Sequence, residues 1–455
     1  MATLTQAAPR EKKRRTKQTS RDVLAHLFMA AWICVLMQGA LRKWVFPGAS
    51  ILYLIQDVPL LAAYFYAAWK GLLWTGKLAW GCVILTIALS IEGMLQIIFV
   101  SLSLRTAVLG LHHYVFYLPI LFLAPVCYNL KHRQTFIRWN MLIAVPMAII
   151  AAVQSRSPRG AWINRTSAGD DTAFGLAGDT VRATGTFNFT MFYSIWCGVA
   201  VALVVGEWLL PPERRAFKSR IVLLVCTLSA VLANMVSGSR TAIMLAFLGF
   251  LGGFAAVVYT RNVRLISRFS AILLLVPVVA VAGYFAAPAS FQAVVDRFSG
   301  EENQQSILTR IDHAIFGFTY AASYSVLGMG VGYGIPAANP AAESQGLILS
   351  ENEPIRLLQE MGTYTGSALV ALRYIACLLM MLVAFKCLSL PRGHSFPHAL
   401  PLAFSAAPTL LFGELVRSAP MLSTQIYYSI ALILGAVLFQ REPLAAGPLQ
   451  ESKTR

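Results

Sequence analysis

The sequence predicts an all-α membrane protein, a polytopic bundle of about twelve transmembrane helices with one long loop between the ninth and tenth spans. Charged residues make up only 13% of the 455 residues, whereas a soluble domain carries about 25%. Apolar runs near the ~20 residues that cross a hydrocarbon core recur along the chain. Alternating strands of about ten residues, which a membrane β-barrel would need, are absent from the sequence.

A span is expected wherever such an apolar run is bounded by polar or basic residues. The fifth expected span is short and the eleventh contains Pro401 and Pro408, so these two helices are the least regular. The spans are expected near residues 22–41, 51–69, 78–100, 107–128, 139–153, 188–210, 221–236, 241–259, 269–287, 363–385, 399–415 and 421–439.

The chain is expected to form one membrane domain, residues 22–440, between a basic tail of residues 1–21 and a short tail of residues 441–455. No cleavable signal peptide is expected, because the first apolar run is long enough to span the membrane. Two connecting loops are long, residues 154–187 and 288–362, and both fall on the same side of the bilayer. A long ordered loop in a compact protein is usually functional.

The 37 lysines and arginines are divided unevenly between the two sides of the membrane. With these spans, 24 lie on the side of both termini, 12 lie on the side of the long loops, and Arg373 lies within a span. Basic residues accumulate in cytoplasmic loops, so both termini are expected in the cytoplasm. The net charge of +17 therefore reflects topology, and nucleic acid is not an expected partner.

The seven cysteines all fall in spans or at their inner ends. None lies in an outer loop, so no disulfide framework is expected, and no metal-type spacing occurs. Acidic pairs in the outer loops could bind a hard cation, but no EF-hand spacing supports such a site. Neither a metal nor another cofactor is expected.

Four short motifs follow one another on the outer side. Residues 182–187 (RATGTF) lead into the sixth span, and residues 237–242 (SGSRTA) form an outer turn. Residues 327–334 (LGMGVGYG) alternate glycine with other residues, and residues 351–362 (ENEPIRLLQEMG) precede the tenth span. In this order and spacing they resemble the O-antigen ligase/polymerase family of bacterial polytopic membrane glycosyltransferases. Residues 39–47 (GALRKWVFP) resemble a segment of its polymerase-like members.

The resemblance implies a chemistry. Members of this family transfer a glycan from an undecaprenyl diphosphate carrier to an acceptor hydroxyl at the periplasmic face of the inner membrane. The donor arrives already activated on lipid, so no nucleotide-sugar motif is needed. The implied partners are the undecaprenyl-diphosphate-linked glycan, membrane lipids, and a chain-length regulator or copolymerase.

The resemblance also places the carrier diphosphate on arginines of the outer side. Negative charge builds on the diphosphate as the sugar–oxygen bond breaks, and a guanidinium placed beforehand stabilises that charge by gripping phosphate oxygens. This role falls by motif on Arg182 and Arg240, and also on Arg310. The alternative for each arginine is a loop anchor that binds lipid headgroups or backbone carbonyls.

The acceptor hydroxyl must lose a proton, and histidine is the usual general base. Ligase-type members carry a His-Asn pair before the last loop helix, whereas Glu351 and Asn352 stand at that position here. Glu351 is therefore the candidate base, and Glu353 is close enough to share the task. The alternatives are an ion pair with an arginine and a solvated helix start. The missing histidine favours a polymerase over a ligase, and His313 is the reserve base.

Arg356 is a further candidate for binding the diphosphate. Glu360 matches an acidic residue of the family and follows Arg356 by four residues, which indicates an ion pair on one helix face. Arg356 would then orient the helix and could still reach a phosphate.

Ionisable residues within spans are costly, and they indicate a functional site or a pairing partner. Asp57, Glu92 and Arg373 lie within spans. Asp57 is expected to pair with Arg42 or Lys43, and Glu92 with Arg373. A groove for the carrier lipid is the alternative for the second pair.

The leading hypothesis is an inverting, lipid-diphosphate-dependent glycosyltransferase that polymerises oligosaccharide repeats into exopolysaccharide or O-antigen for the cell envelope. The second is an O-antigen ligase whose acceptor is lipid A core. The third is a polytopic transporter or lipid flippase. Transporters place binding residues near the bilayer midplane, whereas the polar candidates here gather at one face.

Overall fold

The computed structural model is all-α, as the composition predicts. The only strands among the described residues are β1 (Leu176–Ala177) and β2 (Thr180–Val181), which pair antiparallel with Leu176 opposite Val181. The structure describes residues 7–73, 76–166, 176–177, 180–299, 308–309, 312, 315–335, 352–390, 395–413 and 419–439.

The helices and short helical turns follow one another along the described parts of the chain. Their bounds are α1 (Ala7–Ala40), η1 (Leu41–Val45), η2 (Ser50–Leu54), α2 (Asp57–Trp69), α3 (Lys77–Phe99), α4 (Leu104–Val115), α5 (Ile120–Cys127), α6 (Leu130–Arg156), η3 (Trp162–Asn164), α7 (Thr190–Leu209), η4 (Pro212–Arg214), α8 (Arg220–Met235), α9 (Arg240–Thr260), α10 (Val263–Ala286), α11 (Pro288–Ser299), η5 (Gly317–Ser323), α14 (Glu353–Leu388), α15 (Ala399–Phe412) and α16 (Ala419–Leu438).

Nine helical segments among the described residues are long and apolar enough to cross a membrane. Three further apolar helices in that part of the chain are shorter, Arg220–Met235, Ala399–Phe412 and Ser423–Leu438. Every span expected from the sequence coincides with one of these helices. The chain is therefore a membrane protein by the length and composition of its helices, and a total of twelve spans stays a prediction.

The expected fifth span is longer in the structure than in the sequence prediction. The apolar run at 139–153 is the second half of α6, which has 27 residues. Asn129 caps this helix by accepting a hydrogen bond from the backbone N–H of His132 (3.0 Å). The first turns are polar and pack against the loop between α7 and α8, so an apolar window alone could not detect them.

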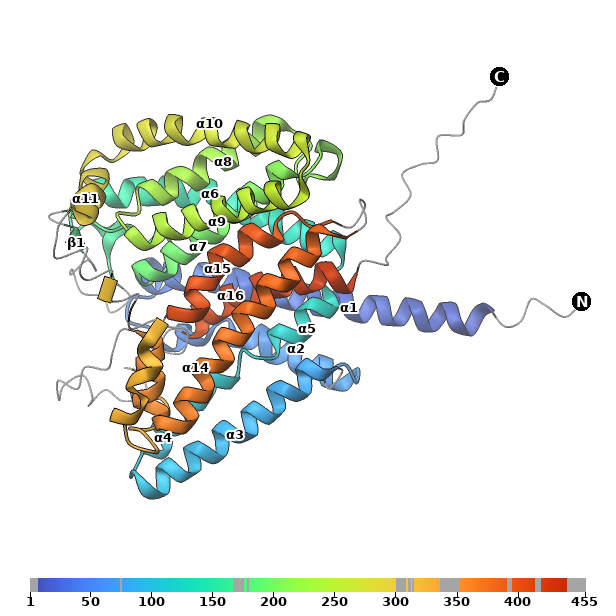
Figure 1. Cartoon of the computed structure of the whole chain (residues 1–455), viewed down its shortest axis with the longest axis vertical. Coiled ribbons are helices and arrows are strands. Elements are labelled where there is room, and N and C mark those ends of the chain that lie inside the picture. The colour runs from blue at the N-terminus through green and yellow to red at the C-terminus, as the bar shows by residue number, and fades with distance from the viewer. Residues whose placement is uncertain are drawn as a thin grey trace, which may run out of the picture.

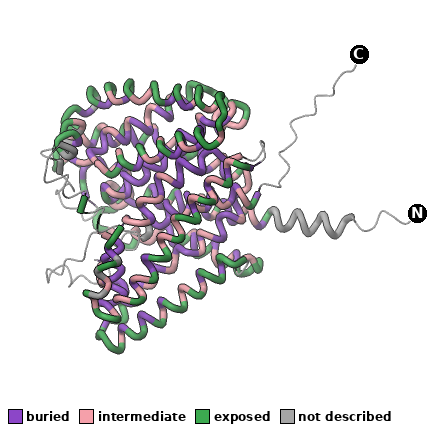
Figure 2. The backbone as a smooth tube through the Cα atoms, viewed as in Figure 1, coloured by how far each residue is buried: buried purple, intermediate pink, exposed green. Residues whose placement is uncertain are grey.

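The helices lie side by side, from α10 at one edge of the bundle through α7 in the middle to α3 at the other edge (Figure 1). α7 packs against α6, α8, α9, α15 and α16, and nearly all of its residues are buried. Exposed residues concentrate on α10 and α3 (Figure 2). α1 begins at one end of the bundle, whereas β1 and α11 lie at the opposite end.

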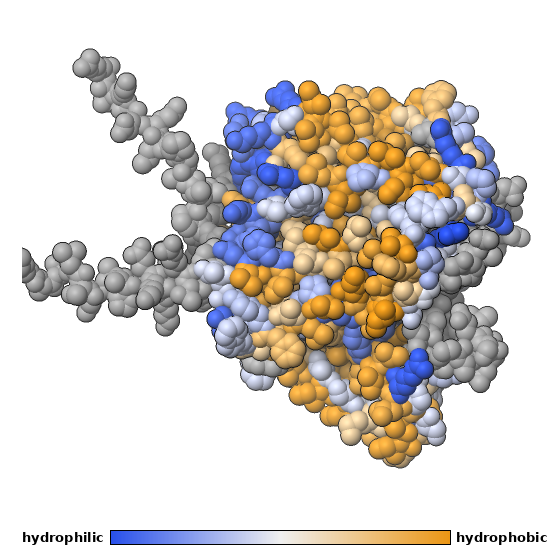
Figure 3. All heavy atoms as spheres, turned by 180° about the vertical axis from the view of Figure 1, so that it is seen from behind, coloured by the Kyte–Doolittle hydropathy of each residue, from blue (hydrophilic) through white to orange (hydrophobic). Residues whose placement is uncertain are grey.

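The surface of the bundle is apolar across its middle. Figure 3 shows hydrophobic side chains there, with hydrophilic side chains gathered at the end beside the termini and in patches at the other end. Exposed aliphatic and aromatic residues on α3, α9 and α10 contribute to this surface. A belt of this kind is the surface that lipid solvates in place of water.

α14 is a helical hairpin and not one straight span. Gly362 has φ 73° and ψ −175°, which divides the helix into a first segment, 353–361, and a second segment, 363–388. Arg373 Nη2 lies 2.7 Å from Glu353 Oε1, so the first segment begins alongside a point about three turns into the second. The segment that the sequence places directly before the tenth span, residues 351–362, therefore does not lead straight into it: the described part, from Asn352, folds back on that span.

Candidate functional site

The RATGTF segment, residues 182–187, is held by two polar side chains from neighbouring helices. Lys43 of η1 is 1% exposed, and its Nζ donates to Thr184 Oγ1 (2.9 Å) and Gly185 O (2.7 Å). Gln154 Oε1 accepts from the backbone N–H groups of Thr184 (3.0 Å) and Gly185 (2.8 Å), and its Nε2 donates to Gly185 O (3.1 Å). The backbone after Arg182 is thereby fixed without regular secondary structure.

Close approach of α1 explains why the segment 39–47 accompanies the RATGTF segment. A Cβ atom on Gly39 would lie 2.2 Å from Thr186 O, so only glycine allows this contact. Gly185 has φ +55°, the left-handed region that favours glycine. Two of the motifs singled out in the sequence therefore form one structural unit.

Arg182 lies beside the turn that precedes Arg240, between α8 and α9. A Cβ atom built on Gly238 would lie 3.7 Å from Arg182 Cγ, and Gly238 is two residues before Arg240. Both arginines are half-buried. Arg182 Nε is buried and has no hydrogen-bond partner among the described residues.

Two helix N-termini meet beside these arginines. α7 begins at Thr190 and α9 at Arg240, and Ser194 Oγ lies 2.9 Å from Ser239 Oγ, the side chain before the first turn of α9. Peptide dipoles place partial positive charge at each N-terminus, so the pair favours an anion. Arg240, at the first position of α9, adds a positive charge at this place, where the helix dipole opposes it.

A second polar cluster surrounds the glycine run, residues 327–334. Glu360 is 0% exposed and accepts from Tyr114 Oη (2.8 Å) and from the backbone N–H of Gly334 (3.1 Å). Gln96 of α3 accepts from Val331 N (2.6 Å) and donates to Leu327 O (2.7 Å). The run is thus folded around a buried carboxylate and a buried amide.

The run needs glycine because its backbone adopts positive φ angles and passes too close to neighbouring helices for a side chain. Gly328, Gly330 and Gly332 all have positive φ, and a Cβ on Gly332 would lie 2.6 Å from Gly110 Cα. The alternation of glycine seen in the sequence therefore lets the loop touch α4 and α14 at backbone distance.

Glu353 is the first residue of α14, and it forms two ion pairs. It is 0% exposed, pairs with Arg356 on its own turn, and lies 2.7 Å from Arg373 Nη2. Arg356 is 1% exposed, and its Nε lies 3.9 Å from Glu360 Oε1, so the expected i, i+4 pair is present at long range. Of the alternatives for Glu353, the structure therefore shows the ion pair with an arginine. The expectation that Arg373 pairs with Glu92 is wrong, because Arg373 pairs with Glu353.

The other two intramembrane carboxylates also have partners that the sequence did not indicate. Glu92 accepts from Thr365 Oγ1 (3.0 Å). Asp57 lies 3.1 Å from His112 Nε2 and accepts from Tyr117 Oη (2.8 Å), so its expected pairing with Arg42 or Lys43 is wrong. The apolar runs of a sequence predict how deep in the membrane a residue lies, but its hydrogen-bond partner depends on which helix packs against it.

An apolar pocket of about 280 Å³ lies beside the second cluster, between α3, α4, α14 and α16. Leucines form half of its lining residues, and His113 and Arg373 are among its few polar side chains. His113 is 4% exposed, and its Nδ1 donates to Leu109 O (2.8 Å) because a carbonyl can only accept. His113 Nε2 and Arg373 Nη1 have no hydrogen-bond partner among the described residues.

The two clusters are joined through η2. The Arg42 guanidinium lies over the Tyr53 ring at 5.7 Å from its centroid, and the Tyr53 ring lies 6.3 Å from the His113 ring, nearly parallel to it. Arg42 is the residue before Lys43, which holds the RATGTF segment. The arginine site and the apolar pocket are therefore neighbours in one scaffold.

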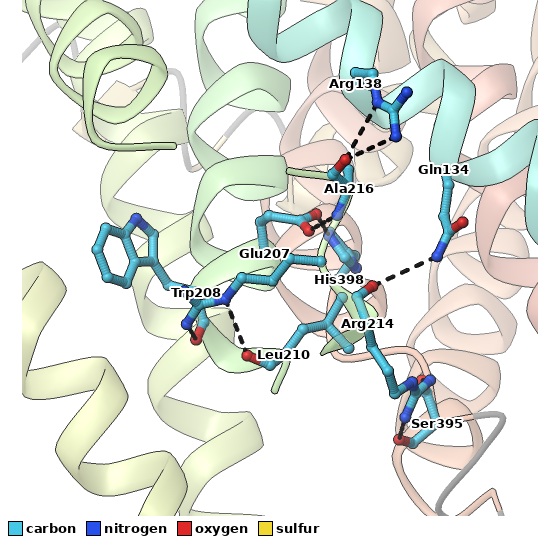
Figure 4. A network of polar contacts seen from close by, with 10 residues as sticks. Gln134, Arg138, Glu207, Trp208, Leu210, Arg214, Ala216, Ser395 and His398 are labelled. Carbon is cyan, nitrogen blue, oxygen red and sulfur yellow. Dashed lines mark hydrogen bonds and ion pairs between the residues drawn. The ribbon is translucent and has the colours of Figure 1, made fainter. Parts of the chain in front are cut away.

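A different polar network lies near the far end of α7 (Figure 4). Glu207 is 1% exposed, lies 3.1 Å from His398 Nε2, and accepts from the backbone N–H of Ala216. Arg138 donates to Ala216 O through Nε (3.2 Å) and Nη2 (2.8 Å). These contacts fix the loop between α7 and α8, so part of the basic charge at this end satisfies backbone carbonyls.

Three of the residues singled out in the sequence lie outside the described residues: the candidate base Glu351, the candidate diphosphate-binding residue Arg310 and the reserve base His313. Sequence reasoning missed Gln96 and Gln154. Gln96 lies within an otherwise apolar run, which is the signal that could have identified it. Gln154 is the first residue after such a run, where a polar residue carries no special signal.

No group of histidine, cysteine and acidic side chains suited to a metal ion occurs among the described residues. Models of known protein families give no match to the sequence, and no curated protein matches it. Function is therefore inferred from the residues and their geometry.

Proposed function

We propose that the chain is an inverting membrane glycosyltransferase that polymerises undecaprenyl-diphosphate-linked oligosaccharide repeats. Twelve spans would cross the bacterial inner membrane, with both termini in the cytoplasm and the RATGTF segment at the periplasmic face. The observation that carries the proposal is the meeting of Arg182, Arg240 and the N-termini of α7 and α9 at one place.

The diphosphate is the group that this place suits. A guanidinium is always charged and presents a planar fork of donors that matches phosphate oxygens. Arg182 Nε is buried and lacks a partner among the described residues, so one donor of that fork is unused. Lys43 and Gln154 fix the backbone beside it, and a fixed donor stabilises developing charge without reorganising.

The lipid chain of the carrier has a matching site in the leucine-lined pocket. That pocket is bounded by α3, whose other face carries exposed apolar residues such as Ile84 and Ile91. A lipid chain entering from the bilayer would exchange one apolar environment for another, so van der Waals packing against these side chains would hold it there. Arg373 would lie along its path.

The transfer step balances with one base. The acceptor hydroxyl oxygen attacks the anomeric carbon, the bond from that carbon to the phosphate oxygen breaks, and the electron pair leaves with the lipid diphosphate. The hydroxyl proton passes to a carboxylate. Because Glu353 is engaged by Arg356 and Arg373, we assign the proton to Glu351 and give Glu353 the role of holding the two arginines.

Reconstitution in liposomes with a lipid-linked repeat unit tests the proposal. Wild-type protein should form long glycan and release undecaprenyl diphosphate. Arg182→Ala and Arg240→Ala should each lower the rate by about 100-fold or more, the usual effect of removing one preorganised donor. Arg264→Ala, an exposed arginine at the start of α10, is the matched control and should leave the rate unchanged.

Full activity of both clamp variants would refute the proposed site. Glycan transfer only when lipid A core is supplied, with no elongation, would identify a ligase instead.

One observation favours a transporter as the second candidate. α14 folds back at Gly362 and brings Glu353 and Arg373 together about three turns into the bilayer-spanning segment. Discontinuous helices with buried charge line substrate sites in transporters. A transporter would move the lipid-linked repeat between leaflets without forming any glycosidic bond, which the same liposomes can report.

A further inference from the structure

Two tryptophans stack at the edge of the arginine site. The rings of Trp44 and Trp162 lie 5.6 Å apart between centroids with planes 29° apart. Trp44 is half-buried, and Lys43 Nζ lies 4.9 Å from its ring centroid. Trp162 is 53% exposed. One face of the pair is therefore supported by the protein and the other is open.

The loop that carries Trp162 is held by the buried side chain of Asn164. Asn164 Nδ2 lies within hydrogen-bond distance of Gln154 O (3.1 Å), Ser157 O (3.1 Å) and Pro158 O (3.0 Å). An exposed tryptophan on a fixed loop loses little conformational freedom when it binds a ligand.

One backbone carbonyl, Ile163 O, connects the stacked pair to the RATGTF segment by hydrogen bonds. Ile163 O accepts from Trp44 Nε1 (3.3 Å) and from Gln154 Nε2 (3.1 Å). The same Gln154 Nε2 donates to Gly185 O (3.1 Å), three residues after Arg182. The side-chain amide of Gln154 thus fixes the position of the aromatic pair relative to the RATGTF segment, which carries Arg182.

We propose that Trp162, backed by Trp44, is the platform on which a sugar ring of the acceptor glycan stacks. One face of a pyranose ring is lined with C–H groups, which pack against the electron-rich face of an indole. The exposed residues Arg159 and Arg165 flank Trp162 in sequence and supply donors for hydroxyl or carboxylate groups of the glycan. This inference rests on the proposed function and names the part of the substrate that the aromatic pair binds.

Tryptophans also gather at membrane interfaces, where they anchor helices among lipid headgroups. That role is served by an isolated ring whose N–H faces the headgroups. Here the N–H of Trp44 is used by Ile163 O, and its ring supports a second tryptophan. The two roles can be distinguished by measuring the acceptor KM: a sugar platform contributes to acceptor affinity, which an aromatic replacement of Trp162 should largely restore, whereas a membrane anchor does not contribute to it.

The test measures acceptor kinetics in the reconstituted system. The acceptor is the lipid-free oligosaccharide released by mild acid from the lipid-linked repeat. Trp162→Ala should raise the acceptor KM about tenfold, equivalent to about 1.4 kcal/mol, and leave kcat unchanged. Trp162→Phe should restore most of the affinity because it keeps an aromatic face. Trp139→Ala on α6, where the tryptophan is 51% exposed, is the control and should not change KM.

The outcomes separate the two proposals. If wild-type protein elongates glycan and Trp162→Ala keeps the wild-type KM, the platform is refuted while the glycosyltransferase stands. A loss of kcat and of membrane abundance in Trp162→Ala, equalled by Trp139→Ala, would mean a membrane anchor and would also refute the platform. If wild-type protein forms no glycan, both proposals fail.

Discussion

Gln154 and Gln96 solve the same physical problem at two places. Each lies in an apolar helix and binds backbone groups of a segment that has no regular secondary structure. Backbone N–H and C=O groups buried away from water must be paired, and in a membrane water cannot supply the partner. A primary amide offers both a donor and an acceptor, so one side chain can satisfy both kinds of backbone group.

This argument predicts the effect of Gln154→Leu. The substitution keeps the approximate size of the side chain and removes the acceptor for two N–H groups and the donor for Gly185 O. Each buried group left unpaired costs about 1–3 kcal/mol, so the apparent melting temperature in detergent should fall. Polymer formation should fall with it, because Arg182 loses its fixed backbone.

Gln134→Leu on the same helix is the matched control. Gln134 makes one long hydrogen bond, to Arg214 O at 3.4 Å, so its loss should shift the melting temperature little. Equal shifts for the two variants would contradict the role given to Gln154.

At the scale of elements, the hairpin of α14 organises the site. The first segment places Glu353 and Arg356 beside the second segment, and Gly366 lets the two pack at backbone distance, since its Cβ would lie 2.7 Å from Leu357 O. The glycine run then folds over the hairpin and binds Glu360. One change of backbone direction therefore creates both the ion-pair cluster and one wall of the apolar pocket.

The hairpin should depend on Gly362 for two separable reasons. Its φ of +73° costs a side-chain-bearing residue about 1–2 kcal/mol, and a Cβ there would lie 2.0 Å from Val326 O. Gly71 has φ +64° with nothing within 4 Å of its Cβ position. Gly71→Ala should therefore lower the melting temperature slightly, whereas Gly362→Ala should prevent the protein from accumulating in the membrane. Similar abundance of the two variants would show that the hairpin is not required.

The sequence predicts the helices of this element well and its partners poorly. Apolar runs placed every expected span on a helix, because hydrocarbon requires a minimum length of apolar residues. The fold-back at Gly362 leaves that pattern unchanged, so Glu353 could not be recognised as the partner of Arg373. The sequence placed Arg182 and Arg240 only in two motifs on one side, since the approach of Arg182 to the turn before Arg240 depends on how the segments pack.

Across the whole molecule, charge and apolar surface are arranged for a bilayer. The apolar belt in Figure 3 separates the end that carries the start of α1 from the end that carries β1 and α11. At one end, Arg138 of α6 donates to Ala216 O in the loop between α7 and α8. Arg182 and Arg240, the proposed diphosphate-binding residues, lie at the other end. The distribution of lysine and arginine along the sequence predicts which end is cytoplasmic.

Cysteine labelling tests that orientation. Arg159 and Lys218 are both exposed and lie in loops that the predicted topology places on opposite sides. The seven native cysteines are buried or half-buried, so they should give a low background. A membrane-impermeant maleimide should label Arg159→Cys in intact cells and should label Lys218→Cys only after the membrane is permeabilised. The reverse pattern would place Arg182 and Arg240 in the cytoplasm, where a carrier-linked glycan awaiting polymerisation would not meet them.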